Sequence, residues 1–170
     1  MRNFRIPLLL TVVGLLFAVR GVFAQTLTYF KPGTDPDGFR GIKWGQSFDS
    51  VIQEMEYMKT DPGNNDINIY KKKDDRLMIG DVELSKIEYY FWKNRFYKVI
   101  IYSDGFSNWK GLQEGTFERF GRGLQSESKK EEYSWFGNTR MILSYDESRK
   151  QGILTMFSRE ISTLQQEHDW

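Results

Sequence analysis

The side chains that most often carry catalysis are scarce in this chain. Among its 170 residues there is one histidine, His168, and no cysteine. Without cysteine there is no thiolate nucleophile, no cysteine-based zinc site and no covalent haem attachment. A single histidine near a chain end, where residues usually fray, is also unsuited to Ser-His-Asp catalysis or to histidine-based metal binding. The sequence therefore predicts no catalytic residue, no metal site and no cofactor.

Two segments are rich in the oxygen ligands that calcium prefers. Residues 61–66 read Asp-Pro-Gly-Asn-Asn-Asp, and residues 35–38 read Asp-Pro-Asp-Gly. An EF-hand loop needs glycine at its sixth position and glutamate at its twelfth, but counting from Asp61 these positions hold Asp66 and Lys72. Both segments consist of the commonest turn-forming residues, so we expect plain turns.

Phosphate-binding and carboxylate-based sites have no clear signature either. Gly121-Arg122-Gly123 is too short for a Walker loop or a dinucleotide-binding motif. The charged clusters at residues 71–76 and 129–132 mix basic and acidic side chains, which is typical of solvated loops. Aspartate and glutamate are plentiful, so a carboxylate-dependent hydrolase acting on cell-wall material stays an alternative, although no pair of acids is distinguished.

The first 24 residues have the order of parts found in an export signal. Two arginines precede an apolar run over residues 6–19, and Val22-Phe23-Ala24 offers a cleavage site. A membrane-spanning helix needs about 20 apolar residues, and Arg20 interrupts this run. We therefore expect residues 1–24 to be a cleaved signal peptide, with no membrane anchor after cleavage and a periplasmic or secreted location.

Removal of such a signal changes the charge balance. The full chain has 24 basic and 23 acidic side chains, and residues 1–24 hold three of the basic ones and no acidic one. The remaining 21 basic and 23 acidic groups leave the protein close to neutral. Little electrostatic attraction for nucleic acid or anionic lipid remains, so we expect no nucleic-acid partner.

The remaining length is sufficient for one hydrophobic core. We expect a loop-rich lead-in at residues 25–40, because proline, glycine and aspartate recur there, a single domain over 41–158, and a C-terminal helix or tail over 159–170.

Two helices are predicted from hydrophobic spacing and capping residues. Ser47 predicts the N-cap of a two-turn helix that carries Phe48, Val51, Ile52 and Met55 on one face. A longer helix is expected from Ser107 to Phe120, with Gly121 as its stop and with Trp109, Leu112, Thr116 and Phe120 as its inner stripe. Gly111 and Gly115 are unfavourable inside it, each by about 1 kcal/mol relative to alanine.

Strands are expected where β-branched and aromatic residues alternate with polar ones. Their ranges are 57–72 with a turn at 61–65, 81–92, 96–103, 132–136, 140–145 and 152–158. Each half of the chain, 47–104 and 107–158, then reads as one helix followed by about three antiparallel strands. This possible duplication of an αβββ unit predicts an α+β fold in which an antiparallel sheet carries its helices on one face and leaves the other face open.

The hairpin of residues 81–103 fixes which side chains share a face. A three-residue loop, with Asn94 or Arg95 in the left-handed conformation, gives apolar pairs throughout: Phe91–Tyr97, Tyr89–Val99 and Ile87–Ile101. A two-residue loop would place Lys98 opposite Tyr89 on the buried face. The three-residue register is therefore preferred, and it places the following side chains on the open face: Lys86, Glu88, Tyr90, Trp92, Lys98, Ile100 and Tyr102.

Aromatic and cationic side chains on an open sheet face suit a protein-binding surface, since aromatic rings bring contact area at little entropy cost. The candidate binding residues are Tyr90, Trp92, Lys98 and Tyr102. The alternative is ordinary cross-strand packing, in which Lys98 or the C-terminal helix covers Tyr90 and Trp92.

A resemblance to known groups of proteins also points to a binding function. The segment from Gly38 to Gly45 (GFRGIKWG), with Ile79-Gly80, Ile87-Glu88-Tyr89, Phe96 and Ser107-Asn108, resembles a group of small exported bacterial proteins with a GIKWG motif. The resemblance covers residues 38–157. Its motifs are structural glycine and aromatic positions, so it implies no functional residue. The order of helix and strands is also similar to BamE-like and β-lactamase-inhibitor-protein modules, which implies binding of other proteins.

These inferences together predict an exported, soluble, non-enzymatic binding or envelope-accessory protein with a protein partner in the cell envelope. The oligomeric state is left open. The alternatives are the carboxylate-dependent hydrolase and a secreted or periplasmic inhibitor of a hydrolase, for which residues 61–66 are the only candidate loop.

Overall fold

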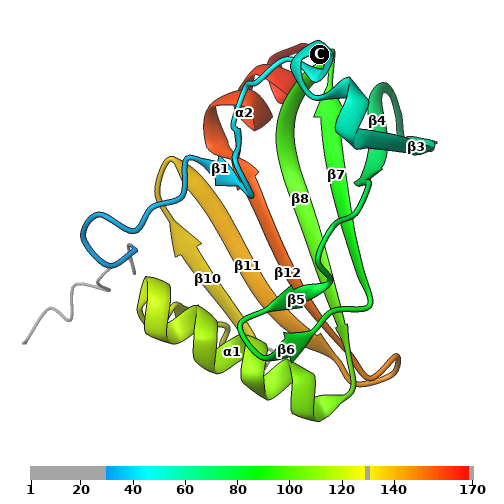
Figure 1. Cartoon of the computed structure of the whole chain (residues 1–170). Coiled ribbons are helices and arrows are strands. Elements are labelled where there is room, and N and C mark those ends of the chain that lie inside the picture. The colour runs from blue at the N-terminus through cyan, green and yellow to red at the C-terminus, as the bar shows by residue number, and fades with distance from the viewer. Residues whose placement is uncertain (1–29, 129–130, 169–170) are drawn as a thin grey trace, which may run out of the picture.

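The computed structural model describes residues 30–128 and 131–168. Its centre is an eight-stranded antiparallel sheet in the order β3-β4-β7-β8-β12-β11-β10-β9, and helix α1 lies across it (Figure 1). The predicted α+β fold, an antiparallel sheet with helical cover on one face, is confirmed. The predicted signal peptide, residues 1–24, lies outside the described residues.

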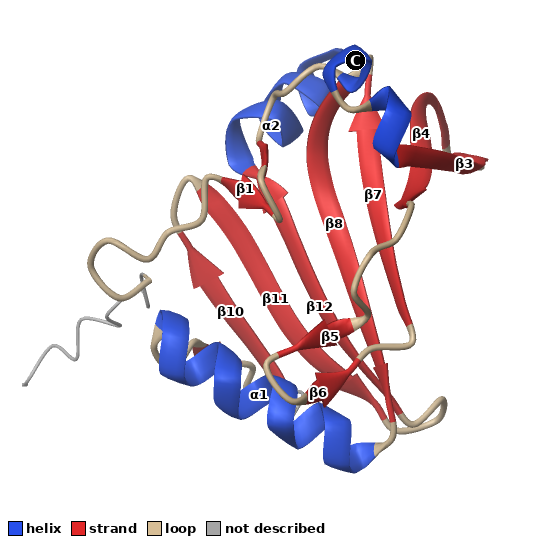
Figure 2. Cartoon of the chain, in the orientation of Figure 1, coloured by secondary structure: helices blue, strands red, loops and turns tan. Residues whose placement is uncertain are grey.

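Strands are the commonest regular structure in the described chain (Figure 2). The sheet contains β3 (Met55–Asp61), β4 (Asn64–Lys72), β7 (Lys86–Trp92), β8 (Arg95–Asp104), β9 (Leu124–Gln125), β10 (Glu132–Phe136), β11 (Thr139–Asp146) and β12 (Gln151–Ser158). Outside it lie two short hairpins, β1 (Gly38–Phe39) with β2 (Ile42–Lys43) and β5 (Met78–Ile79) with β6 (Val82–Glu83). The helices are α1 (Phe106–Phe120) and α2 (Arg159–His168). Within the described ranges, no helix has the length and apolar character needed to cross a membrane.

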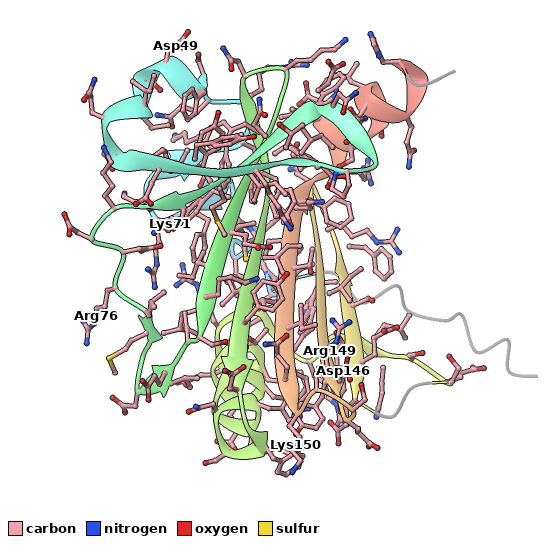
Figure 3. All side chains as sticks on the ribbon, turned by 90° about the vertical axis from the view of Figure 1, so that its right-hand side faces the viewer. Asp49, Lys71, Arg76, Asp146, Arg149 and Lys150 are labelled. Carbon is pink, nitrogen blue, oxygen red and sulfur yellow. The ribbon has the colours of Figure 1, made fainter. Side chains whose placement is uncertain are left out.

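Two four-stranded meanders build the sheet. One contains β3, β4, β7 and β8, the other contains β9, β10, β11 and β12, and they join where β8 pairs with β12. In Figure 3 the β3–β4 hairpin crosses the upper part of the molecule, with Asp49 at that end, while Asp146 and Arg149 lie in the β11–β12 turn at the opposite end. The strands of both meanders lie where the sequence predicts them, except that the expected strand 81–92 is divided into β6 and β7 and that β9 was not expected.

The predicted two-turn helix after Ser47 is wrong. Two short 3₁₀ turns, η1 (Phe48–Ser50) and η2 (Ile52–Glu54), take its place. The Ser47 side chain does accept the Asp49 N–H at 3.3 Å, but the Phe48 N–H donates to the carbonyl of Asn94 at 2.8 Å and so ties the segment to the β7–β8 turn. Strand β3 begins at Met55, which leaves too little length for a stable α-helix.

The β7–β8 hairpin turns over two residues rather than the predicted three. Lys93 and Asn94 have φ values of 44° and 64°, as a type I′ turn requires, so the left-handed residues are these two and not Arg95. The shorter turn alone would place Lys98 opposite Tyr89.

A β-bulge restores the register that the shorter turn would shift. The pairs along the hairpin are Ile87–Ile101, Tyr89–Val99, Tyr90–Lys98 and Phe91–Phe96. Two of the predicted pairs are therefore confirmed, and the predicted Phe91–Tyr97 pair is wrong. Tyr97 is the extra residue of the bulge, which lets β8 gain one residue without turning its inner side chains outward.

Helix α1 packs on the sheet through the predicted stripe. Trp109, Leu112, Thr116 and Phe120 are all buried, and the helix contacts β12, β8 and β6. Its N-cap is Gly105, with a φ of 82°, rather than the predicted Ser107, because the helix already begins at Phe106. The main core thus lies between α1 and the sheet.

Glycines set how closely α1 approaches its neighbours. A Cβ on Gly152 of β12 would lie 2.6 Å from the Ser103 Oγ and 3.0 Å from a ring carbon of Trp109. A Cβ on Gly111 would lie 2.7 Å from a methyl carbon of Val82 in β6. By contrast, a Cβ on Gly115 would have no described atom within 4 Å. Two of these three glycines are therefore explained by close packing, and Gly115 is not.

The lead-in is attached to the body of the protein by hydrogen bonds. The Asp35 carboxylate accepts the N–H groups of Asn138 at 2.7 Å and Thr139 at 3.1 Å. The buried Thr139 hydroxyl donates to the Pro36 carbonyl and accepts the Trp44 indole N–H at 2.7 Å. The described part of the lead-in is thus a loop that leads into β1, and it is fixed to the turn between β10 and β11.

Gly152→Ala should lower the free energy of unfolding by about 1–3 kcal/mol, because the added methyl overlaps Ser103 and Trp109. The matched control, Gly115→Ala, should raise it by about 1 kcal/mol, because alanine favours the helix and meets no neighbour. Urea denaturation of the two variants measures both effects. Equal effects of the same sign would contradict the close approach of α1 to β12.

Candidate binding face

The face of the sheet opposite α1, here called the open face, carries alternate residues of every long strand. Its side chains form three cross-strand rows, given from β7 to β10: Lys86-Tyr102-Ile153-Ser144-Glu132, Glu88-Ile100-Thr155-Ile142-Ser134 and Tyr90-Lys98-Phe157-Arg140-Phe136. Tyr90, Lys98 and Tyr102, three of the four candidate binding residues, lie in these rows. The fourth, Trp92, lies on the same face one step beyond Tyr90 and opposite Arg95.

Tyr90 and Trp92 are not solvent-facing. They are 7% and 3% exposed and belong to a second hydrophobic cluster at one end of the open face. The other buried members of this cluster are Ile67, Ile69, Tyr97 and Ile161. The Lys98 ammonium lies 4.0 Å from the ring centroid of Tyr90, and the ring of His168 in α2 lies 6.0 Å from that of Trp92. The expectation of exposed rings is therefore wrong, and the alternative of cross-strand packing under Lys98 and the C-terminal helix describes both residues.

Glu88 supplies a buried negative charge on the open face. Its side chain is almost inaccessible, although it lies on the face opposite α1. One carboxylate oxygen accepts the hydroxyls of Tyr90 at 2.9 Å and Tyr102 at 3.1 Å. The other pairs with the Lys86 ammonium at 2.9 Å. Glu88 therefore connects two of the candidate residues through hydrogen bonds.

The pKa of Glu88 reflects this network. Burial disfavours the charged form, but the hydrogen bonds from Lys86 and Tyr90 and the charge of Lys86 outweigh it, so the pKa lies below its ordinary value. Burial and the Glu88 charge in turn raise the pKa values of Tyr90 and Tyr102, so both hydroxyls stay protonated as donors. A general acid needs a raised pKa, and Glu88 is therefore suited to fixing the strands rather than to proton transfer.

Lys98 is the half-buried cation of the open face. Burial lowers its pKa, whereas the nearby charges of Asp61 and Glu88 act in the opposite direction. Lys98 lines a groove of about 530 Å³ between β8, β12 and α2, together with Asp61, Tyr97, Phe157 and the α2 residues Ser162, Gln165 and Gln166. The groove thus brings an ammonium group, a carboxylate and two aromatic rings together at the edge of the second cluster.

The exposed apolar surface of this face lies beyond the predicted residues. Five half-buried side chains, here called the apolar strip, run from β8 across β12 and β11 to β10: Ile100, Ile153, Phe157, Ile142 and Phe136. Strand β12 signals the strip in the sequence, because Ile153 and Phe157 are apolar on one side while Leu154 and Met156 are apolar on the other. In an antiparallel strand that faces water on one side, apolar residues usually alternate with polar ones. Apolar residues on both sides of β12 therefore indicate in the sequence that its outer side is also apolar.

Candidate sites for other chemistry are weaker. Within residues 30–128 and 131–168, no group of three or more histidine, aspartate or glutamate side chains is placed to hold a metal ion. A cleft of about 700 Å³ between the lead-in and α2 contains several acids. Among them, Asp35 already accepts two backbone N–H groups, and Asp37, Glu160 and Glu167 are exposed. The cleft therefore shows no buried carboxylate pair of the kind that glycoside hydrolysis uses.

No protein-family model, curated protein or solved structure matches the chain. The resemblances to the GIKWG group and to the BamE-like and inhibitor modules accordingly stay predictions. The function is inferred below from the geometry of the open face.

Glu88→Gln should lower the free energy of unfolding at neutral pH by about 1–3 kcal/mol, because the amide cannot replace the charged acceptor. The folded-state pKa of Glu88 lies below its ordinary value of 4.5. The charge therefore stabilises the folded protein fully above that value, and the contribution is lost as the pH falls through the lowered pKa. The difference between wild type and variant should shrink over this acidic range in urea denaturation.

Glu147→Gln is the matched control for this experiment, since Glu147 is an exposed carboxylate in the β11–β12 turn. It should change the free energy of unfolding by less than about 0.5 kcal/mol. A difference between wild type and Glu88→Gln that widens on acidification would contradict the stabilising role of the Glu88 charge.

Proposed function

We propose that this chain is an exported, non-enzymatic binding protein of the cell envelope, and that it binds a protein partner through the apolar strip of its open face. The observation that carries the proposal is the strip itself: five half-buried apolar side chains on four neighbouring strands, with Thr155 between Ile100 and Ile142 and Arg140 between Phe157 and Phe136. Helix α1 lies on the opposite face. Helix α2 reaches the open face through Ile161 in the second cluster, against which Ile100 packs, and it lines the groove beside Phe157. Among the described residues, α2 therefore borders the strip at Ile100 and Phe157, and α1 does not cover it.

The composition of the strip suits a protein interface. Interface centres are enriched in aromatic and aliphatic side chains and depleted in charge, whereas rims are polar. The centre here is Ile100, Ile142 and Ile153, and polar side chains flank it in the same rows.

The charges beside the strip indicate the chemistry of the partner. Lys98 and Arg140 flank Phe157 in one row, and the Arg140 guanidinium lies 4.7 Å from the ring centroid of Phe136. The negative charge of Glu88 is already engaged by Lys86 and two tyrosine hydroxyls. This end of the strip therefore favours a partner that combines apolar side chains with acidic ones at its rim.

The buried candidate residues contribute rigidity. Tyr90 and Trp92 pack between β4, β8 and α2, and Tyr102 is held by Glu88. A surface whose strands are already fixed loses less conformational entropy on binding than a mobile one. Among the four predicted residues, Lys98 and Tyr102 are the ones placed to contact a partner directly, and Tyr90 and Trp92 support them.

The two alternatives receive less support. The carboxylate-dependent hydrolase lacks a buried acid pair among the described residues of the lead-in cleft. The hydrolase inhibitor would need a protruding loop, but Asp61 pairs directly with Asn64, so the β3–β4 hairpin has a tight turn of two residues. The Asp61 side chain also lines the groove beside Lys98. The predicted export signal supports an envelope location for each of the three functions equally.

The double variant Ile142→Asp/Ile153→Asp should reduce recovery of the partner from envelope extract at least about tenfold, since two contacts at an interface centre commonly contribute more than 1.4 kcal/mol. Introduced carboxylates also repel an acidic rim. The measurement is affinity capture of cross-linked complexes from the native cell followed by quantitative mass spectrometry. Circular dichroism and thermal unfolding confirm that the variant is folded.

The matched control is Leu77→Asp/Phe106→Asp, which alters two exposed apolar side chains away from the open face, 42% and 53% exposed. Only a protein that the control retains and the strip variant loses counts as the partner. Equal recovery of every captured protein by both variants would remove the open face as the binding surface.

A further inference from the structure

A separate pocket lies on the α1 side of the sheet. It has a volume of about 400 Å³ and is bounded by α1, the β1 and β5 segments and β12. Its walls are mainly apolar and include Phe39, Ile79, Leu112, Phe120, Leu154 and Met156. Volume and lining are typical of small-molecule sites, which are concave, mostly apolar and provided with a few polar groups. The sheet separates this pocket from the open face, so the inference below does not rest on the proposed function.

The charged groups of the pocket are both cations. Arg40 and Arg119 line it, and no acidic side chain is among its described lining residues. Arg40 is held in place by an ion pair with Asp75 and by a 2.8 Å hydrogen bond to the Met78 carbonyl. The Asp75 carboxylate is fixed in turn by the hydroxyl of the buried Tyr89 at 2.7 Å. Because Asp75 offsets the charge of Arg40, the positive charge that the pocket offers to a ligand comes mainly from Arg119.

The second arginine comes from the C-terminal part of α1. Arg119 is exposed, and its guanidinium lies 5.3 Å from the ring centroid of Phe120, which is itself a wall of the pocket. An exposed guanidinium beside an apolar wall can contact an anionic group while the attached apolar part enters the pocket. Arg119 is thus placed at the boundary between pocket and solvent.

Gly115 leaves one side of the pocket open. It lines the pocket from the middle of α1, is itself exposed, and a Cβ there would meet no described atom. Gly111, one turn earlier, is by contrast in close contact with Val82. The space beside Gly115 therefore offers an apolar chain a way into the pocket from solvent.

We propose that this pocket binds a single-chain anionic amphiphile, such as a fatty acid, with its hydrocarbon chain between α1 and the sheet and its anionic head at Arg119 and Arg40. Met78 and Met156 in the lining suit a flexible chain, because methionine adapts its shape to irregular ligands. The cations favour an anionic over a neutral or cationic amphiphile.

Residues 25–29 of the chain are the alternative occupant, because they directly precede Phe30. The Phe30 ring packs against Phe120, a wall of the pocket, with ring centroids 5.8 Å apart. The sequence of residues 25–29, Gln-Thr-Leu-Thr-Tyr, contains no acidic side chain. It therefore does not complement Arg40 and Arg119, which is why the proposal commits to an anionic ligand.

Isothermal titration calorimetry of the folded protein with laurate, below its critical micelle concentration, tests the proposal. Laurate should bind saturably with one site and at least about tenfold more tightly than dodecyltrimethylammonium, which has a chain of the same length and a cationic head. Arg119→Gln should reduce this preference about threefold or more. Absence of saturable laurate binding, or equal affinity for the two amphiphiles, would overturn the proposal.

Gly115→Leu provides the structural arm of the experiment. It should weaken laurate binding at least about tenfold by filling the pocket, while the favourable helix propensity of leucine keeps the protein folded. The matched control Glu114→Leu introduces the same side chain at an exposed position of α1 that does not line the pocket, and it should leave laurate affinity unchanged. Equal affinity of both variants would overturn the assignment of the pocket.

Deletion of residues 25–29 distinguishes the two occupants. If laurate affinity is the same with and without these residues, the pocket takes the amphiphile as proposed. A gain of about tenfold or more on deletion would show that the segment competes for the pocket, and the proposal would be wrong.

Discussion

The pairing of β8 with β12 is the interaction on which the rest of the structure depends. It joins two meanders that would otherwise be separate small sheets, and it runs without a register shift from Asp104–Gln151 to Lys98–Phe157. Because both strands are central, each is packed on both sides. Their inner residues form the floor under α1, and their outer residues Ile100, Ile153 and Phe157 form much of the apolar strip.

The two faces of this sheet are stabilised by different means. On the α1 side, large side chains such as Trp109 and Trp135 fill the space between helix and strands. On the open face, a single buried carboxylate, Glu88, is surrounded by donors and draws β7 and β8 together. A charge that is almost inaccessible yet has a lowered pKa is compensated by its hydrogen bonds. The apolar strip and the amphiphile pocket are thus on opposite sides of one rigid element.

Local spacing was sufficient to predict the strands, α1 and the α+β class, because period-two and period-3.6 patterns report which face each element buries. It was not sufficient for the β7–β8 turn. Asn94 suits a positive φ in either loop and so does not distinguish the two loop lengths. The bulge at Tyr97 that compensates for the shorter turn has no marker in residue spacing. The burial of Trp92 depends on α2, which follows it by more than sixty residues, and so could not be read from the hairpin. The part of the apolar strip on β12 was predictable, because Ile153 and Phe157 are apolar on the side opposite Leu154 and Met156.

The attachment of the lead-in to the β10–β11 turn has a consequence for how the chain folds. The Asp35 carboxylate binds backbone groups 103 and 104 residues later in the sequence, and the strand order likewise brings distant segments together. Contacts of such long range form slowly, since loop closure must precede any gain in energy. If the chain is exported from its N-terminus as proposed, Asp35 has no partner until the second meander has emerged on the far side. Slow, late closure would keep the polypeptide extended during passage and complete the fold only at its destination.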